Sequence, residues 1–234
     1  MQNHTDRFQN FHRYLSNQSI YPLLLSTFFA VVLFSLRVLY SFTFSYSNLV
    51  WNLFLAWIPF IFSLWTFALY SKHPDRRWII VVPGLLWLLF FPNAPYILTD
   101  FLHLKERPGI PIWYDILMLA SFVWTGIFLG VASLRTMQLL VKNHLGWFVS
   151  WMFTGGVLAL AGIGIYLGRF SRWNSWDVFF SPKEILSDIV LRVVNPLSNM
   201  NFYGFTTIVT AFLIICYLMF TTMRKESKVG KNLE

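Results

Sequence analysis

The chain has 234 residues, of which 56% are hydrophobic and only 12% are charged. Soluble domains carry about 25% charged residues, so this composition excludes an ordinary soluble protein and indicates a membrane protein. The net charge of +8 does not indicate nucleic-acid binding, because basic residues in a membrane protein are typical of cytoplasmic loops. The single cysteine, Cys216, excludes an internal disulfide and a paired-cysteine metal knuckle.

Six apolar runs have the length needed to cross the hydrocarbon of a bilayer. We therefore predict an all-α integral membrane protein built as a bundle of six transmembrane helices. In chain order, the predicted spans are 20–44, 48–70, 78–99, 113–138, 146–168 and 201–222. The polar segment 1–19 and the basic segment 223–234 flank this membrane domain of 20–222.

The distribution of lysine and arginine predicts the orientation of the bundle, because cytoplasmic loops carry an excess of both. With the amino terminus inside, eleven of the 18 basic residues fall in inner segments and six in outer segments, and Arg37 lies within the first span. The outer connection 41–48 carries no charge, whereas the inner connection 71–77 is basic. Both terminal tails are therefore predicted to be cytoplasmic.

A longer connection, 169–200, follows the fifth span. Within it, Ser181 to Glu184 predicts a helix start, with serine as the cap, proline at the first helical position and glutamate completing a capping box. The helix is expected to cover 182–194 and to end before Asn195-Pro196, and at about 20 Å it is too short to cross the membrane. Its apolar and charged residues lie on opposite sides, which predicts an interfacial helix on the outer leaflet.

The third span runs into the segment Pro92–Pro95, which carries two prolines and an asparagine. Proline lacks a backbone donor and disfavours helix in the residue before it, so the chain is expected to break here. It is expected to restart at Tyr96. A helical restart would bring Asp100 and His103, three residues apart, onto one face.

Polar side chains from several spans are predicted to reach the same outer level of the membrane. Three carboxylates balance three guanidinium groups there, namely Asp100, Asp115 and Asp177 against Arg37, Arg169 and Arg172. Charged groups at membrane depth usually pair with one another or line a wet cavity. Two interpretations stay open: a structural network of ion pairs that clamps the helix ends, and a functional pocket that uses the same network.

If the network is a functional pocket, carboxylates and the imidazole are the candidates for acid/base catalysis. Cations, amides and aromatic rings are the candidates for substrate binding. The candidate catalytic residues are Asp100, His103, Asp115 and Asp177. The candidate substrate-binding residues are Arg37, Asn93, Tyr96, Arg169, Arg172, Trp173, Asn174 and Trp176. The arginines also suit contact with lipid headgroups, and the tryptophans also suit an aromatic belt. Further metal ligands are scarce around Asp100 and His103, so neither a metal nor a cofactor is assigned.

Small residues repeat at a spacing of four in the fourth and fifth spans. The pairs are Gly126 with Gly130, Gly155 with Ala159, and Gly164 with Gly168. Small residues at this spacing let helix backbones approach closely in lipid. The pattern predicts either close packing within one bundle or the seam of a homo-oligomer.

Four stretches carry a resemblance to a known family. WNLFLAWIPF (51–60), FFPNAPYILTDFLHL (90–104), WYD (113–115) and GIYLGRFSRWNSWD (164–177) resemble the uncharacterised bacterial multi-pass membrane family catalogued as domain of unknown function 1361. The resemblance covers most of the chain, from Arg37 to the sixth span. It implies an integral protein of a bacterial cell membrane, and it brings no activity, substrate or catalytic residues with it.

The leading functional hypothesis is an outward-facing polar site that binds or processes an anionic envelope substrate, either lipid-linked or free. One alternative is a non-catalytic membrane subunit or scaffold whose tryptophan-rich rim contacts a partner. Another is a small transporter, which is disfavoured because the inner halves of the spans contain almost no ionisable groups. The lipid bilayer is the expected partner, and nucleic acid is not.

Overall fold

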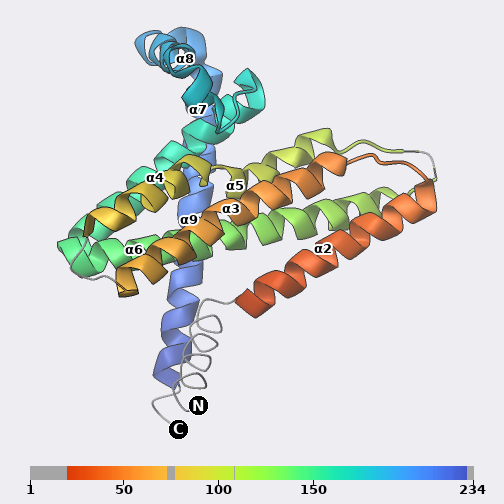
Figure 1. Ribbon diagram of the computed structural model, residues 1–234. Helices are drawn as coiled ribbons and strands as arrows, with labels where there is room; N and C mark the ends of the chain where they lie inside the picture. The colour runs from red at the N-terminus through yellow and green to blue at the C-terminus, as the bar shows by residue number, and fades with distance from the viewer. Residues whose placement is uncertain (1–19, 73–76, 108, 231–234) are drawn as a thin grey trace.

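The computed structural model describes residues 20–72, 77–107 and 109–230, and nearly all of them are helical (Figure 1). Extended pairing within these ranges is confined to one isolated bridge between Arg107 and Ile110. The predicted all-α class is therefore confirmed. The elements in chain order are α2 (Ile20–Ser41), α3 (Ser47–Lys72), η1 (Arg77–Ile80), α4 (Val81–Phe90), α5 (Asn93–Tyr96), η2 (Ile97–His103), α6 (Ile112–Tyr166), η3 (Leu167–Ser171), α7 (Asp177–Phe180), α8 (Pro182–Val194), η4 (Leu197–Asn199) and α9 (Met200–Gly230).

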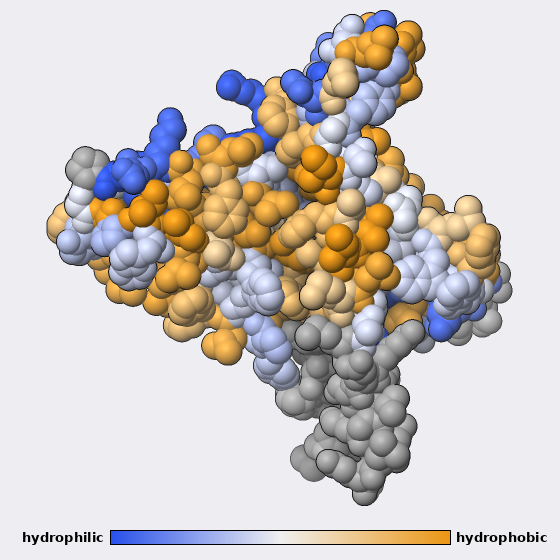
Figure 2. Space-filling view, turned by 180° about the vertical axis from the view of Figure 1, so that it is seen from behind, coloured by the Kyte–Doolittle hydropathy of each residue, from blue (hydrophilic) through white to orange (hydrophobic). Residues whose placement is uncertain are grey.

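Five helical stretches of the described residues are long and apolar enough to cross a membrane. They are Ile20–Ser41, Ser47–Lys72, Trp78–His103, Ile112–Ser171 and Leu197–Thr222. Large apolar side chains stay exposed along them, including Leu25 at 69% and Phe28 at 67%. Figure 2 shows apolar residues over much of one face of the molecule. An apolar exterior of this extent suits lipid and not water, which agrees with the predicted membrane class.

The two predicted tails are described only in part. Residues 1–19 and 231–234 lie outside the described ranges. Helix α9 continues to Gly230, so the helix takes in residues that the sequence predicts as a tail. In Figure 1, α9 crosses the other long helices instead of running alongside them, and it packs against α6.

Helix α6 contains one break in helical geometry, at Gly146, where φ is +87° and ψ is 176°. Side chains with a Cβ rarely adopt this backbone conformation, so glycine is the residue that permits it. Figure 1 shows the helix reversing and returning on itself. We call 112–145 the first arm and 147–166 the second arm. The sequence predicts separate spans at 113–138 and 146–168, but the first arm stays helical up to the reversal, because a single glycine can redirect the chain.

The third apolar stretch is interrupted at Phe91-Pro92, the start of the predicted break, but helix resumes at Asn93 and not at Tyr96 as predicted. Helix α4 ends at Phe90, and the backbone amide of Tyr96 then bonds the carbonyl of Pro92 at 3.0 Å, forming the short helix α5. The next element, η2, is a 3₁₀ helix. Residues three apart are eclipsed in this helix type, so Asp100 and His103 share a face, as predicted.

Two glycine pairs, one in α6 and one that spans α6 and η3, pack against this break. A Cβ on Gly126 would lie 2.6 Å from the carbonyl oxygen of Ala94, and one on Gly164 would lie 2.8 Å from Pro92 Cγ. Gly130 and Gly168 face the same segment at 3.4 Å or less. These four glycines therefore serve packing within the bundle. Gly155 is different, because a Cβ there would meet nothing within 4 Å.

The connections between the long helices lie at two ends of the bundle. At one end, which we call the Tyr46 end, the Tyr46 hydroxyl donates to the carbonyl of His103 and accepts from the amide of Lys105, both at 3.4 Å. At the other, the His144 end, the rings of Tyr70 and His144 meet edge to face at 4.9 Å. Two apolar cores fill the space between. Helices α2 and α3 with the first arm form one core, and α4, α9 and both arms form the other.

Helix α8 covers the residues that the sequence predicts, Pro182–Val194, and Asn195 follows it. The predicted capping box does not form, because the Ser181 side chain makes no capping hydrogen bond. The backbone carbonyl of Ser181 accepts from the amide of Ile185 at 3.2 Å, which is the ordinary first bond of the helix. Proline at the first helical position and Asn195-Pro196 at the end thus suffice to set these bounds.

Candidate functional site

Asp100 is the centre of a buried polar cluster that joins three segments. Its Oδ1 lies 3.8 Å from Arg169 Nη1, and the side chain is 1% exposed. Asn48 donates to Oδ1 at 3.2 Å and Asn52 donates to Oδ2 at 2.8 Å. Helices α3, η2 and η3 are therefore tied together by one carboxylate that has both a counter-charge and amide donors, as a buried charge requires.

Neither Asn48 nor Asn52 is among the candidate site residues predicted from the sequence. The two amides lie four residues apart on α3, a spacing that brings side chains onto one helix face. This pair of amides near the start of an apolar span was the available signal. It did not reveal the acceptor, because the acceptor belongs to another segment of the chain.

Arg37 and Asp115 form a second buried cluster, between α2 and the start of α6. Arg37 Nε lies 2.7 Å from Asp115 Oδ1, and Nη2 donates to Oδ2 at 3.2 Å. The predicted pairing of Arg37 with a carboxylate is confirmed. The Tyr46 ring lies 4.8 Å from the Arg37 guanidinium and 4.7 Å from that of Arg107. Tyr46 has a φ of +69°, and no residue pattern predicted this contact between two arginines and one ring.

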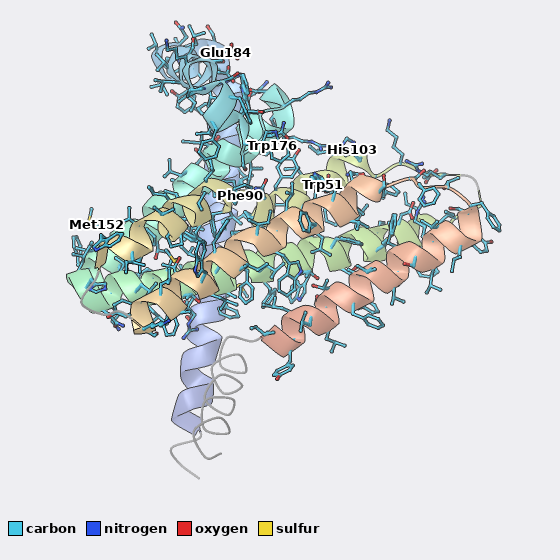
Figure 3. The ribbon with its side chains drawn as sticks, in the orientation of Figure 1. Trp51, Phe90, His103, Met152, Trp176 and Glu184 are labelled. Atoms are coloured by element: carbon cyan, nitrogen blue, oxygen red, sulfur yellow. The ribbon has the colours of Figure 1, made fainter. Side chains whose placement is uncertain are left out.

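A groove of about 410 Å³ opens between α3, α4, the second arm, the 173–176 loop and α8. We call it the Trp51 groove. Its apolar wall is formed by Leu55, Leu88, Leu89, Val157, Leu160 and Ala161. Its polar and aromatic rim is formed by Trp51, Asn52, Asn93, Tyr96, Trp173, Asn174, Ser175 and Trp176. In Figure 3, Trp51 and Trp176 approach each other from α3 and from the loop before α7. Every lining residue is uncharged.

The loop that closes one side of the groove is held by several specific contacts. The amide of Trp173 donates to the carbonyl of Leu167 at 3.2 Å, across Arg172 with its φ of +61°. Trp173 Nε1 donates to Asp188 on α8 at 3.2 Å. Asn93 Nδ2 donates to Ser175 Oγ at 2.9 Å, which joins the proline break to the loop. The preceding turn, η3, is a π-helix, a form that occurs frequently at functional sites.

Five of the twelve predicted site residues line the Trp51 groove, namely Asn93, Tyr96, Trp173, Asn174 and Trp176. Asp100 and Arg169 contact the groove indirectly, since Asn52 both lines it and donates to Asp100. The roles assigned to these residues stay predictions.

The other predicted residues have different surroundings. Asp177 accepts from the backbone amide of Asn174 at 2.7 Å and so closes a local turn. His103 and Arg172 are exposed, and neither lines the groove. The functional pocket that the sequence predicted from these charged groups is therefore not the Trp51 groove, which no charged residue lines. The physical reason is that Arg37 and Asp177 already have partners within reach, so no shared cavity is needed to balance their charges.

Metal binding finds no support in this geometry. Among the described residues, no group of three or more His, Cys, Asp or Glu side chains lies close enough to hold a metal ion.

The fold defines a class: an all-α chain with several helices fit to span a membrane and a groove with a polar and aromatic rim. The chain belongs to the family described as Protein of unknown function (DUF1361), which matches residues 51–216. The matched region contains Asp100, Asn52 and Arg169 of the Asp100 cluster, the proline break and all the residues that line the groove. Comparison with curated proteins and with solved structures gives no match.

Proposed function

We propose that the chain is a multi-pass protein of a bacterial cell membrane whose Trp51 groove binds an amphiphilic, lipid-linked molecule of the cell envelope. The observation that carries this proposal is the division of one groove into an apolar wall and a rim of indoles and amides. Ligand sites in proteins are typically apolar clefts with a few polar groups that fix orientation. An acyl or prenyl chain would lie along the wall, and its headgroup would meet the rim.

Binding is favoured over catalysis by the groups that line the groove. Its lining contains amides, indoles, a serine and a tyrosine, but no carboxylate, imidazole or amine. The nearest carboxylate, Asp100, is 1% exposed and has Arg169 and two amides as partners. A general acid or base must come within hydrogen-bond reach of the substrate, and this carboxylate is occupied by its own partners.

The same proposal includes a topology. Both arms of α6 would cross the membrane, which gives six crossings from five helical stretches. The Tyr46 end and the groove would face outward, and the His144 end with its basic connections would face the cytoplasm, as would both termini. Helix α8 would lie at the outer surface. Ile185 and Ile189 line the groove, which supports α8 as a cover of the binding site.

A scaffold role is the second candidate, and one observation favours it. Trp113 is 58% exposed at the Tyr46 end and does not line the groove. Exposed tryptophans are typical anchors of protein interfaces. A scaffold would bind its partner through the exposed surface around Trp113 and would not need the groove to hold a lipid.

Native mass spectrometry of the full chain, purified in a mild detergent, tests the proposal. We expect an envelope amphiphile to co-purify with the wild-type protein. Leu160→Trp would fill the apolar wall and reduce the bound fraction by about tenfold, equivalent to about 1.4 kcal/mol. Leu117→Trp, at an exposed position outside the groove on the same helix, is the matched control and should retain the ligand. Equal retention by both variants would overturn the proposal.

A further inference from the structure

We infer that the headgroup bound at the rim of the Trp51 groove is an uncharged sugar. This inference rests on the proposed function, because it names the class of headgroup that the lipid-linked ligand carries. The starting observation is chemical: indole rings and carboxamides form the rim, and no charged side chain lines the groove.

Two cations behind the rim, Arg169 and Arg192, are already paired with carboxylates. Arg169 lies 3.8 Å from Asp100, behind Asn52. On the opposite side, Arg192 Nη2 lies 2.7 Å from Asp188 Oδ1, and Asp188 also accepts from Trp173 Nε1. An anionic headgroup entering the groove would find no cation among its lining residues, and burying an uncompensated charge is unfavourable. The ligand's headgroup is therefore expected to be neutral.

The rim matches a sugar in both of its parts. A pyranose presents a face of C–H groups, which packs on an indole ring, and an edge of hydroxyls, which exchange hydrogen bonds with amides. Trp51 and Trp176 are 54% and 37% exposed, so their rings can be reached. Asn174 is exposed, and Asn52 and Asn93 are half-buried. Each carboxamide offers a donor and an acceptor, as a sugar hydroxyl requires.

The anionic ligand predicted from the sequence depended on Arg169 and Arg172 acting together. In the structure, Arg169 pairs with Asp100, while Arg172 is exposed at a left-handed backbone position and does not line the groove. The two guanidinium groups therefore do not form one clamp. A sugar, in contrast, would be recognised by the tryptophans and asparagines that line the groove.

Photolabelling of the full chain in phosphatidylcholine nanodiscs tests the inference. Three probes would carry the same photoreactive dodecyl chain and differ only in the headgroup: β-glucoside, phosphate or phosphocholine. Labelled peptides would be located by mass spectrometry. We expect the glucoside to label peptides that contain Leu88, Leu89 or Leu160 about tenfold more than the phosphate does, a difference of about 1.4 kcal/mol.

Variants of the rim sharpen the result. Trp176→Ala and Asn174→Ala should each lower labelling by the glucoside severalfold and leave labelling by the phosphate unchanged. Trp113→Ala, at an exposed tryptophan outside the groove, should change neither. Trp176→Phe, which keeps an aromatic face, should retain most of the labelling.

The outcomes separate the two proposals. Equal labelling of the wall by all three probes, or stronger labelling by the phosphate, would overturn the sugar inference while leaving a lipid-binding groove. No labelling of the wall by any probe would overturn the proposed function itself. Labelling by the glucoside that is insensitive to the rim variants would also overturn the sugar inference.

Discussion

Arg37 and Asp115 face each other in a two-point ion pair, with distances of 2.7 Å from Nε to Oδ1 and 3.2 Å from Nη2 to Oδ2. Both side chains are almost completely buried. The pair joins α2 to the first arm of α6, and neither residue lines the Trp51 groove. Its role is therefore expected to be structural, in contrast to the Asp100 cluster, which reaches the groove through Asn52.

Removal of one partner of this pair should destabilise the protein strongly. Asp115→Ala leaves the Arg37 guanidinium buried without its carboxylate, and breaking a buried pair in this way costs about 3–5 kcal/mol. The double variant Arg37→Met with Asp115→Leu removes both charges and should recover most of the loss. Thermal unfolding in detergent measures the effect.

A matched control is the partly exposed pair of Asp188 and Arg192. Partly exposed pairs of this kind contribute about 0–1 kcal/mol, so Arg192→Met should shift the midpoint far less than Asp115→Ala. Equal shifts in the two variants would contradict the structural role assigned to Arg37 and Asp115.

Variants of Asn48 and Asn52 can distinguish an effect on ligand binding from an effect on the stability of the fold. Both donate to Asp100, but Asn52 also lines the groove and Asn48 does not. Each substitution by alanine removes a hydrogen bond to a charged group, worth about 1.5–3 kcal/mol, so both variants should unfold at lower temperature. Photolabelling by the glucoside probe should fall in Asn52→Ala and persist in Asn48→Ala. A parallel loss in both variants would mean that Asn52 acts through stability alone.

Because the proline break packs closely on α6, we expect substitution of Gly126 to lower the stability of the protein. In Gly126→Ala, the new methyl group would lie 2.6 Å from a backbone carbonyl oxygen, which cannot move aside easily. Overpacking of this kind costs about 1–3 kcal/mol. Gly155→Ala is the control, since its methyl group would meet nothing within 4 Å. The two variants should differ clearly in unfolding midpoint, and indistinguishable midpoints would contradict the packing described here.

Topology is tested by single cysteines in a Cys216→Ser background. Glu106→Cys lies at the Tyr46 end and Asn143→Cys at the His144 end, and both positions are exposed. A membrane-impermeant maleimide applied to intact cells should label the first and spare the second. Lysed cells should show labelling of both. The reverse pattern on intact cells would turn the groove toward the cytoplasm.

Local sequence signals predicted local structure well. Pro182 and Asn195-Pro196 bounded α8, and the two prolines at 92 and 95 located the break. Each of these acts on its own stretch of backbone, through a missing donor or a fixed φ. The capping box did not form, because the Ser181 side chain makes no hydrogen bond to the first amides of the helix, and residue types alone do not fix that rotamer.

Features that depend on packing between distant segments were not predictable in the same way. The sequence supplied three carboxylates and three arginines, but it did not reveal that Arg37 pairs with Asp115 and Arg169 with Asp100. The groove is uncharged because those pairs form elsewhere. Charge at a common depth therefore did not predict which residues line the groove.

The reversal at Gly146 has a consequence for how the chain enters the membrane. One residue connects the two arms of α6, which leaves no loop long enough to hold one arm in water while the other crosses. With both arms in the bilayer, as proposed, they must insert together as a helical hairpin. The second-arm residues that line the groove and Asp115 on the first arm would then enter the bilayer in the same event.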